Sequence, residues 1–96
     1  MPEASVTLMN ATGLHARPAK IFARAAASAA AEVFVEKDGR RVNAKSVLSV
    51  LTLDCHQGDD IRISVEGDDA EATLSELVAL VESRFGEGGS DEGQQT

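Results

Sequence analysis

The strongest constraint on the fold is the alternation of apolar and polar residues at positions 61–66, where the sequence is IRISVE. Successive side chains of a β-strand point to opposite faces, so this pattern predicts a strand with one buried and one solvated face. Residues 5–9 and 32–37 alternate in the same way. After 32–37, Asp38-Gly39 favours a tight hairpin, and residues 40–43 are expected to form the returning strand.

Three segments predict helices. Residues 16–31 are rich in alanine, the best helix former, and Pro18 stands in the first turn, where its missing N–H costs nothing. Residues 46–53 are expected to form a short helix that opens with Ser46, a good N-cap. The last helix follows an acidic turn at 67–69 and has one apolar face. That face comprises Leu74, Leu77, Val78, Val81 and Phe85.

The predicted order of elements is β-α-β-β-α-β-α, and the short links favour antiparallel pairing. We therefore expect an α+β open-faced β-sandwich, a four-stranded antiparallel sheet covered on one face by helices. The 96 residues suffice for one domain, which we expect to span residues 1–87. Residues 88–96 contain no apolar side chain and are expected to form a disordered acidic tail.

Composition argues against several classes of protein. No apolar run approaches the ~20 residues of a membrane span, and the acidic start lacks the features of a secretory signal. The single cysteine, Cys55, cannot form an internal disulfide, and Cys55-His56 alone is too small a set to hold a metal. These features predict a cytoplasmic protein without membrane insertion.

The net charge of −7 and the presence of only three aromatic residues, all Phe, argue against nucleic-acid binding. The charge is distributed unevenly. Residues 1–58 carry seven basic and five acidic side chains, whereas residues 59–96 carry two basic and eleven acidic ones. The first part of the chain is therefore mildly basic, and the second part supplies the acidic character.

One segment, NATGLHARPA at 10–19, carries most of the chemistry. It places His15 at the predicted start of a helix, with Arg17 two residues later. The positive end of the helix dipole disfavours a protonated imidazole, which leaves a nitrogen lone pair free for nucleophilic attack. The same helix end offers unpaired N–H groups to phosphate oxygens, and Arg17 can share phosphoryl charge. These features favour a phosphohistidine carrier, although a His15 that only occupies a helix start also fits them.

Two sequence motifs resemble those of a known family. GLHARPA at 13–19 resembles the active-site motif of HPr, the histidine-containing phosphocarrier of the phosphoenolpyruvate:sugar phosphotransferase system. VNAKSVLSVLTL at 42–53 is similar to the second signature of that family, and the resemblance spans about residues 4–87.

The resemblance implies that the chain is a carrier rather than an enzyme and that it needs no metal or organic cofactor. His15 would accept a phosphoryl group on Nδ1 from phosphorylated enzyme I and pass it to sugar-specific enzyme IIA domains. Arg17 would help to position and neutralise this group. Ser46 corresponds to the serine that HPr kinase/phosphorylase modifies in many relatives, although Ser49 and Asp54 depart from the usual pattern of the family.

We expect an apolar docking patch near His15, surrounded by basic residues that steer acidic partners. Its apolar members would be Leu14, Val47, Leu48 and Leu51, and its basic members Lys20, Arg24 and Lys45. Within the short helix, Leu48 and Val47 are expected outside, while Val50 or Leu51 contributes to the interior.

Two other functions remain open at this point. One is a nitrogen-related or other branch-specific paralogue of the same carrier, and the other is a non-catalytic module that binds an anion at the same loop. A regulatory homologue that lacks the active histidine is set apart by the presence of His15. In each case we expect a monomer.

Overall fold

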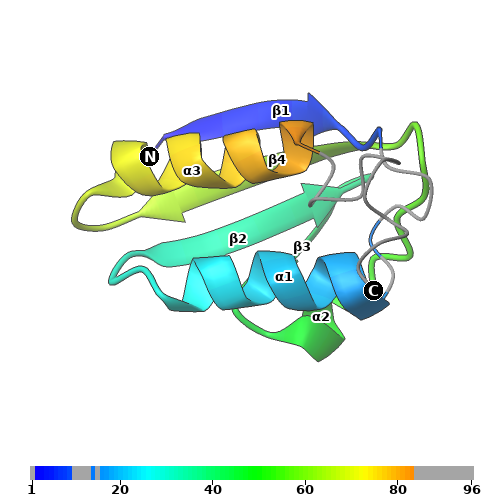
Figure 1. Ribbon diagram of the computed structural model, residues 1–96, viewed down its shortest axis with the longest axis horizontal. Helices are drawn as coiled ribbons and strands as arrows, with labels where there is room; N and C mark the ends of the chain where they lie inside the picture. The colour runs from blue at the N-terminus through cyan, green and yellow to red at the C-terminus, as the bar shows by residue number, and fades with distance from the viewer. Residues whose placement is uncertain (1, 10–13, 15, 84–96) are drawn as a thin grey trace, which may run out of the picture.

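The computed structural model describes residues 2–9, 14 and 16–83 and confirms the expected α+β open-faced β-sandwich. Four strands form one antiparallel sheet in the order β1-β4-β2-β3, and α1 and α3 lie side by side on one face of it (Figure 1). The elements are β1 (Glu3–Thr7), α1 (Ala16–Ala27), β2 (Glu32–Lys37), β3 (Arg40–Asn43), α2 (Val47–Leu51), β4 (Asp60–Glu66) and α3 (Ala70–Glu82).

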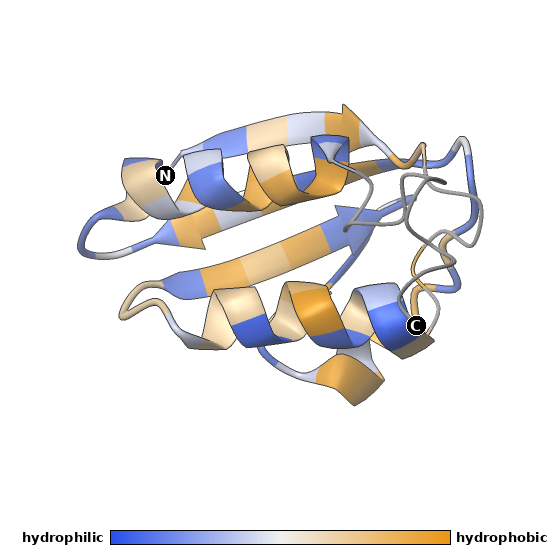
Figure 2. Cartoon of the chain, viewed as in Figure 1, coloured by the Kyte–Doolittle hydropathy of each residue, from blue (hydrophilic) through white to orange (hydrophobic). Residues whose placement is uncertain are grey.

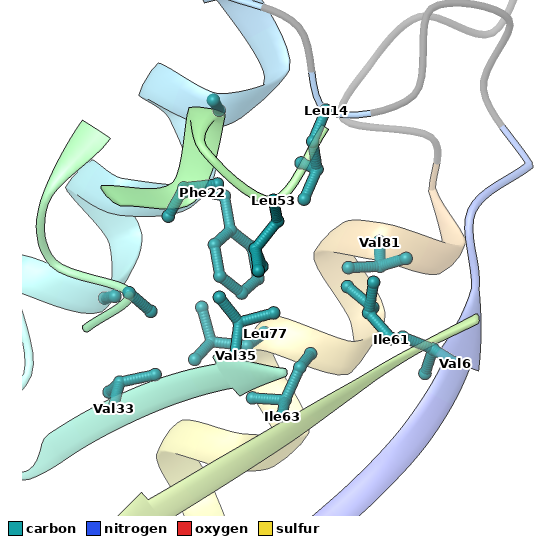
Figure 3. Packing of buried hydrophobic residues seen from close by; sticks show 14 of the residues in the cluster. Val6, Leu14, Phe22, Val33, Val35, Leu53, Ile61, Ile63, Leu77 and Val81 are labelled. Carbon is teal, nitrogen blue, oxygen red and sulfur yellow. The ribbon is translucent and has the colours of Figure 1, made fainter. Parts of the chain in front are cut away.

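The core lies between the sheet and these two helices. In the sheet, Val33 pairs with Val65 and Val35 with Ile63, so apolar side chains of neighbouring strands share the covered face. Phe22 from α1 is fully buried against this layer, as Figure 3 shows. Hydrophilic and hydrophobic residues are interleaved along α1 and α3, as expected of helices that cover a sheet with one side only (Figure 2).

The opposite face of the sheet is open and charged. Arg62 lies between two carboxylates, with its Nε 3.5 Å from Glu3 and its Nη1 3.8 Å from Glu36. Beside them, the guanidinium of Arg41 stacks 4.1 Å above the ring of Phe34. The polar side chains on this face account for the alternation of apolar and polar residues along the strands. Ser64 is the exception among these, because it was expected on the solvated face but is buried.

The hairpin prediction is confirmed. Asp38 and Gly39 have φ values of 53° and 84°, and two successive positive φ angles are what a tight two-residue hairpin of the mirror-image type requires. The flanking strands β2 and β3 have the predicted bounds, and α2 lies within the predicted segment.

Two boundaries differ from the prediction. Helix α1 ends at Ala27 rather than near residue 31, because Ala31 is buried in the core, where it packs close to Gly67, and begins the path into β2. Strand β1 is Glu3–Thr7 rather than 5–9, because its ladder with β4 ends where Thr7 faces Asp60.

The predicted tail and Phe85 lie outside the described residues. Within residues 2–9, 14 and 16–83, no helix is both long and apolar enough to cross a bilayer.

The two phenylalanines of the described core and sheet provide a direct test of this architecture. Phe22→Ala is expected to lower the free energy of unfolding by about 3–5 kcal/mol, since it leaves a cavity in a fully packed core. Phe34→Ala on the open face is expected to cost about 1 kcal/mol, because only its stacking with Arg41 and partial burial are lost. Urea denaturation measures both, and equal losses would contradict the one-sided core.

Candidate functional site

The start of α1 is where the sequence predicts the phosphoacceptor. His15 itself lies outside the described residues, but Ala16 is the first residue of α1, which confirms the predicted helix start. Arg17 is exposed in the first turn, and α1 has no acidic residue there. A cation near a helix N-terminus is unfavourable for helix stability, because it faces the positive end of the dipole. Stabilisation of the helix by its dipole therefore does not account for Arg17 at this position.

Residues 55–57 form hydrogen bonds with Met9 and Leu14, the described residues on either side of positions 10–13. The N–H of Leu14 donates to the carbonyl of Cys55 at 3.1 Å, and Nε2 of Gln57 donates to the carbonyl of Met9 at 3.1 Å. Two further bonds extend the contact: the N–H of Leu8 donates to Asp59 at 2.9 Å, and the N–H of Gly58 donates to Leu8 at 2.7 Å. The described residues that flank positions 10–13 are thus fastened to one stretch of chain.

Leu14 does not belong to an exposed patch, and that expectation is wrong. Its side chain is 2 % exposed and points into the core near Leu53 and Phe22 (Figure 3). A loop that leads into a helix needs an anchor, and the buried Leu14 provides it directly before position 15.

Helix α2 confirms the expected exposure of Leu48 and burial of Val50, whereas Val47, which was expected outside, is half-buried. Leu48 is 77 % exposed, Val50 is fully buried, and Val47 and Leu51 are half-buried. Ser46 caps the helix as predicted: its side-chain oxygen accepts a hydrogen bond from the N–H of Ser49 at 3.2 Å. Because α2 packs against α1, the exposed Leu48 lies beside the helix that follows His15.

The basic residues divide into two groups. Arg17, Lys20 and Arg24 are all exposed on α1, at spacings of three and four that keep them on one side of the helix. Lys45 was expected among them, but its ammonium donates to the carbonyl of Ala29 at 3.0 Å. Ala29 lies just beyond the C-terminal end of α1, so this ammonium is at the end of the helix opposite Arg17.

A side-chain cluster that the sequence pattern did not indicate supports residues 53–59. Nζ of Lys37 lies 3.0 Å from Oδ2 of Asp59 and donates to the carbonyl of Asp54 at 2.8 Å. The pKa of Asp59 is held below its usual value, first by the hydrogen bond from the N–H of His56 and then by Lys37. The same bond to Asp59 raises the pKa of Lys37. Since Lys37 and Asp59 are 22 positions apart, no local motif could have revealed their contact.

Cys55 is buried, and this desolvation raises its pKa to about 11. Burial and the raised pKa both disfavour the thiolate, which is the reactive form of a cysteine. Its neighbour His56 is exposed, with Nε2 3.4 Å from Oδ1 of Asp54. Among the residues that the structure describes, no group of three or more potential ligands could hold a metal ion.

Comparison with known proteins agrees with this geometry. The family model described as "PTS HPr component phosphorylation site" matches residues 2–83. The chain belongs to the HPr family. Proteins of this family are phosphocarriers of the phosphotransferase system rather than enzymes.

Several members of the HPr family are similar to this chain. It is 45 % identical over 82 residues to phosphocarrier protein HPr of Streptomyces coelicolor, covering 84 % of this chain and 88 % of that protein. It is 39 % identical over 82 residues to HPr-like protein Crh of Halalkalibacterium halodurans, covering 85 % and 98 %.

Solved structures of HPr from Thermoanaerobacter tengcongensis are also similar, at 45 % identity. One has a TM-score of 0.88, covering 91 % of this chain and 98 % of that one, and a dimer of HPr has a TM-score of 0.73, covering 91 % and 100 %.

The two leucines near this end of the molecule are expected to respond differently to truncation. Leu14→Ala should lower the free energy of unfolding by about 2–5 kcal/mol, because it removes a buried anchor. Leu48→Ala should change it by less than about 0.5 kcal/mol, because its side chain is already in water. Chemical denaturation of both variants decides the matter, and a stable Leu14→Ala protein would show that Leu14 is not an anchor.

Proposed function

We propose that this HPr-family chain carries a phosphoryl group on Nδ1 of His15, received from phosphorylated enzyme I and passed to sugar-specific enzyme IIA domains. The observation that carries the proposal is the start of α1 at Ala16, within the range 2–83 that the family model matches and with the exposed Arg17 in its first turn. This arrangement suits a bound dianion and gives no advantage to a structural histidine.

The chemistry of the step follows from the helix end. A neutral imidazole, with its proton on Nε2, attacks phosphorus through the lone pair of Nδ1, and the bond between phosphorus and the donor breaks. The unpaired N–H groups of the first turn of α1 and the guanidinium of Arg17 stabilise the phosphoryl oxygens. Because the group must leave again, an accessible site with one arginine is better suited than a deep pocket that would retain it.

Partners would dock on the surface formed by Leu48, with the half-buried Val47 and Leu51, beside the basic side of α1. Arg17, Lys20 and Arg24 carry positive charge there, which favours acidic partners and speeds their encounter. Ser46 would be the target of HPr kinase/phosphorylase. A phosphate at this N-cap suits the helix dipole but adds negative charge next to the docking surface.

The carrier would act as a monomer in the cytoplasm, with residues 1–87 as its domain and 88–96 as a solubilising tail. A nitrogen-related or other branch-specific carrier is the second candidate, since the chemistry of His15 would be the same. The third candidate is a non-catalytic regulatory module that binds an anion at the same loop. Covalent labelling separates this third candidate from the other two.

Incubation with phosphoenolpyruvate and enzyme I is expected to label the protein with a phosphate that acid removes and base does not. His15→Ala should abolish the label, because the nucleophile is lost. The chain contains one other histidine, so His56→Ala is the matched control and should retain full labelling. Intact-protein mass spectrometry measures the added phosphate, and a label that survives His15→Ala would refute the proposal.

Incubation with ATP and HPr kinase/phosphorylase is expected to give an acid-stable label that Ser46→Ala removes and Ser49→Ala keeps. Ser46→Ala should also lower the free energy of unfolding by about 1 kcal/mol, because the N–H of Ser49 loses its capping partner. A wild-type protein that takes up no phosphate would leave Ser46 with its capping role alone.

A further inference from the structure

The ammonium of Lys37 has three oxygen partners on one stretch of chain. Lys37 is the last residue of β2, and its Nζ reaches Oδ2 of Asp59 at 3.0 Å, the carbonyl of Asp54 at 2.8 Å and the carbonyl of Leu53 at 3.5 Å. An ammonium has three N–H donors, so these three oxygens can use all of them. The side chain is only 17 % exposed, which limits competition from water.

These contacts join the two ends of residues 53–59 through the side chain of Lys37. Leu53 and Asp54 follow α2, whereas Asp59 immediately precedes β4, so one ammonium joins both ends of the stretch. Oδ2 of Asp59 also accepts from the N–H of His56 at 2.8 Å, which fastens the middle of the stretch to the same carboxylate. Removal of the Lys37 ammonium would leave the carbonyls of Leu53 and Asp54 without this donor, and removal of the Asp59 carboxylate would leave the N–H of His56 without this acceptor.

Residues 53–59 also form the hydrogen bonds that hold Leu8, Met9 and Leu14, the described residues on either side of positions 10–13. Cys55 accepts from the N–H of Leu14, Gln57 donates to Met9, and Asp59 and Gly58 bond to Leu8. The side chain of Leu14 is buried and cannot shift independently of its surroundings. A change in the position of residues 53–59 would therefore act on Leu14, the residue directly before His15, through its bond to Cys55.

We propose that Lys37 and Asp59 are positioning residues for phosphoryl transfer, and that they act on His15 through residues 53–59 and Leu14. This inference rests on the proposed function. Phosphoryl transfer needs the nucleophile in line with the bond that breaks, and a misplacement of about 1 Å can slow such a reaction about 10²-fold. Neither Lys37 nor Asp59 is among the residues of the docking surface, Val47, Leu48 and Leu51, so loss of the ion pair should reduce kcat and leave KM for the donor unchanged.

The experiment uses the full chain with Lys37→Met and Asp59→Asn, each close in size to the residue it replaces. Arg62→Met and Glu3→Gln are the matched controls, because they remove an ion pair on the open face of the sheet. Lys37→Arg keeps the positive charge and should retain most of the activity.

Two measurements are made on every variant. Steady-state phosphorylation by enzyme I should show kcat reduced about 10-fold or more in Lys37→Met and Asp59→Asn, with KM unchanged and with both constants unchanged in the controls. Hydrogen exchange should be about 10-fold faster at the Leu14 amide, which is bonded to Cys55. It should be unchanged at the Ala44 amide, which is bonded to Val33 in a distant part of the fold.

Each other outcome overturns the inference. If wild type is phosphorylated on His15 and both variants match the controls, the positioning role fails and the proposed function stands. If exchange increases equally at Leu14 and Ala44, the pair only stabilises the fold. If wild type accepts no phosphate on His15, the proposed function fails and the positioning role fails with it.

Discussion

Burial of one face of the sheet beneath α1 and α3 is the constraint on which the rest of the structure depends. The strands present Val33, Val35 and Ile63 to the helices, and the opposite face carries charged pairs such as Arg62 with Glu3. Because α1 lies on the buried face and connects the end of β1 to the start of β2, its direction is fixed relative to the sheet (Figure 1). The start of α1 is thereby placed beside the turn that leads into β4, where Cys55 bonds to Leu14.

The surface charge follows the same division. Helix α1 carries three exposed basic residues and no acidic one, whereas α3 carries Glu71, Glu76 and Glu82 and no basic one. The net charge of −7 therefore does not describe the surface around the start of α1. Under the proposed function, an acidic partner would be attracted to α1 rather than to the acidic α3.

Features determined by neighbouring residues could be predicted from the sequence. The alternation of 32–37, the Asp38-Gly39 turn and the Ser46 cap each depend on interactions within a few positions, and all three are observed. Leu14 could not be placed in this way, because a single leucine in a loop has no period that distinguishes a buried side from an exposed one. Its burial follows from packing against Leu53 and the core.

Contacts between distant parts of the chain explain the other features in which the structure differs from the sequence-based prediction. The alanine content of 16–31 favours a longer helix, yet Ala31 is needed in the core close to Gly67, and this tertiary packing overrides the local preference. The ion pair of Lys37 and Asp59 likewise depends on the pairing of strands. The motif around His15 thus indicates the chemistry. The contacts that hold Leu14 and residues 53–59 join distant parts of the chain, so only the structure reveals them.

The central claim is that Nδ1 of His15 carries the phosphoryl group at the start of α1. The most direct measurement is a ¹⁵N and ³¹P NMR spectrum of the protein, labelled with ¹⁵N in its histidines and phosphorylated by enzyme I. We predict coupling between phosphorus and Nδ1 of His15, with both ring nitrogens of His56 unaffected. Coupling to Nε2 of His15 or to either nitrogen of His56 would contradict this account.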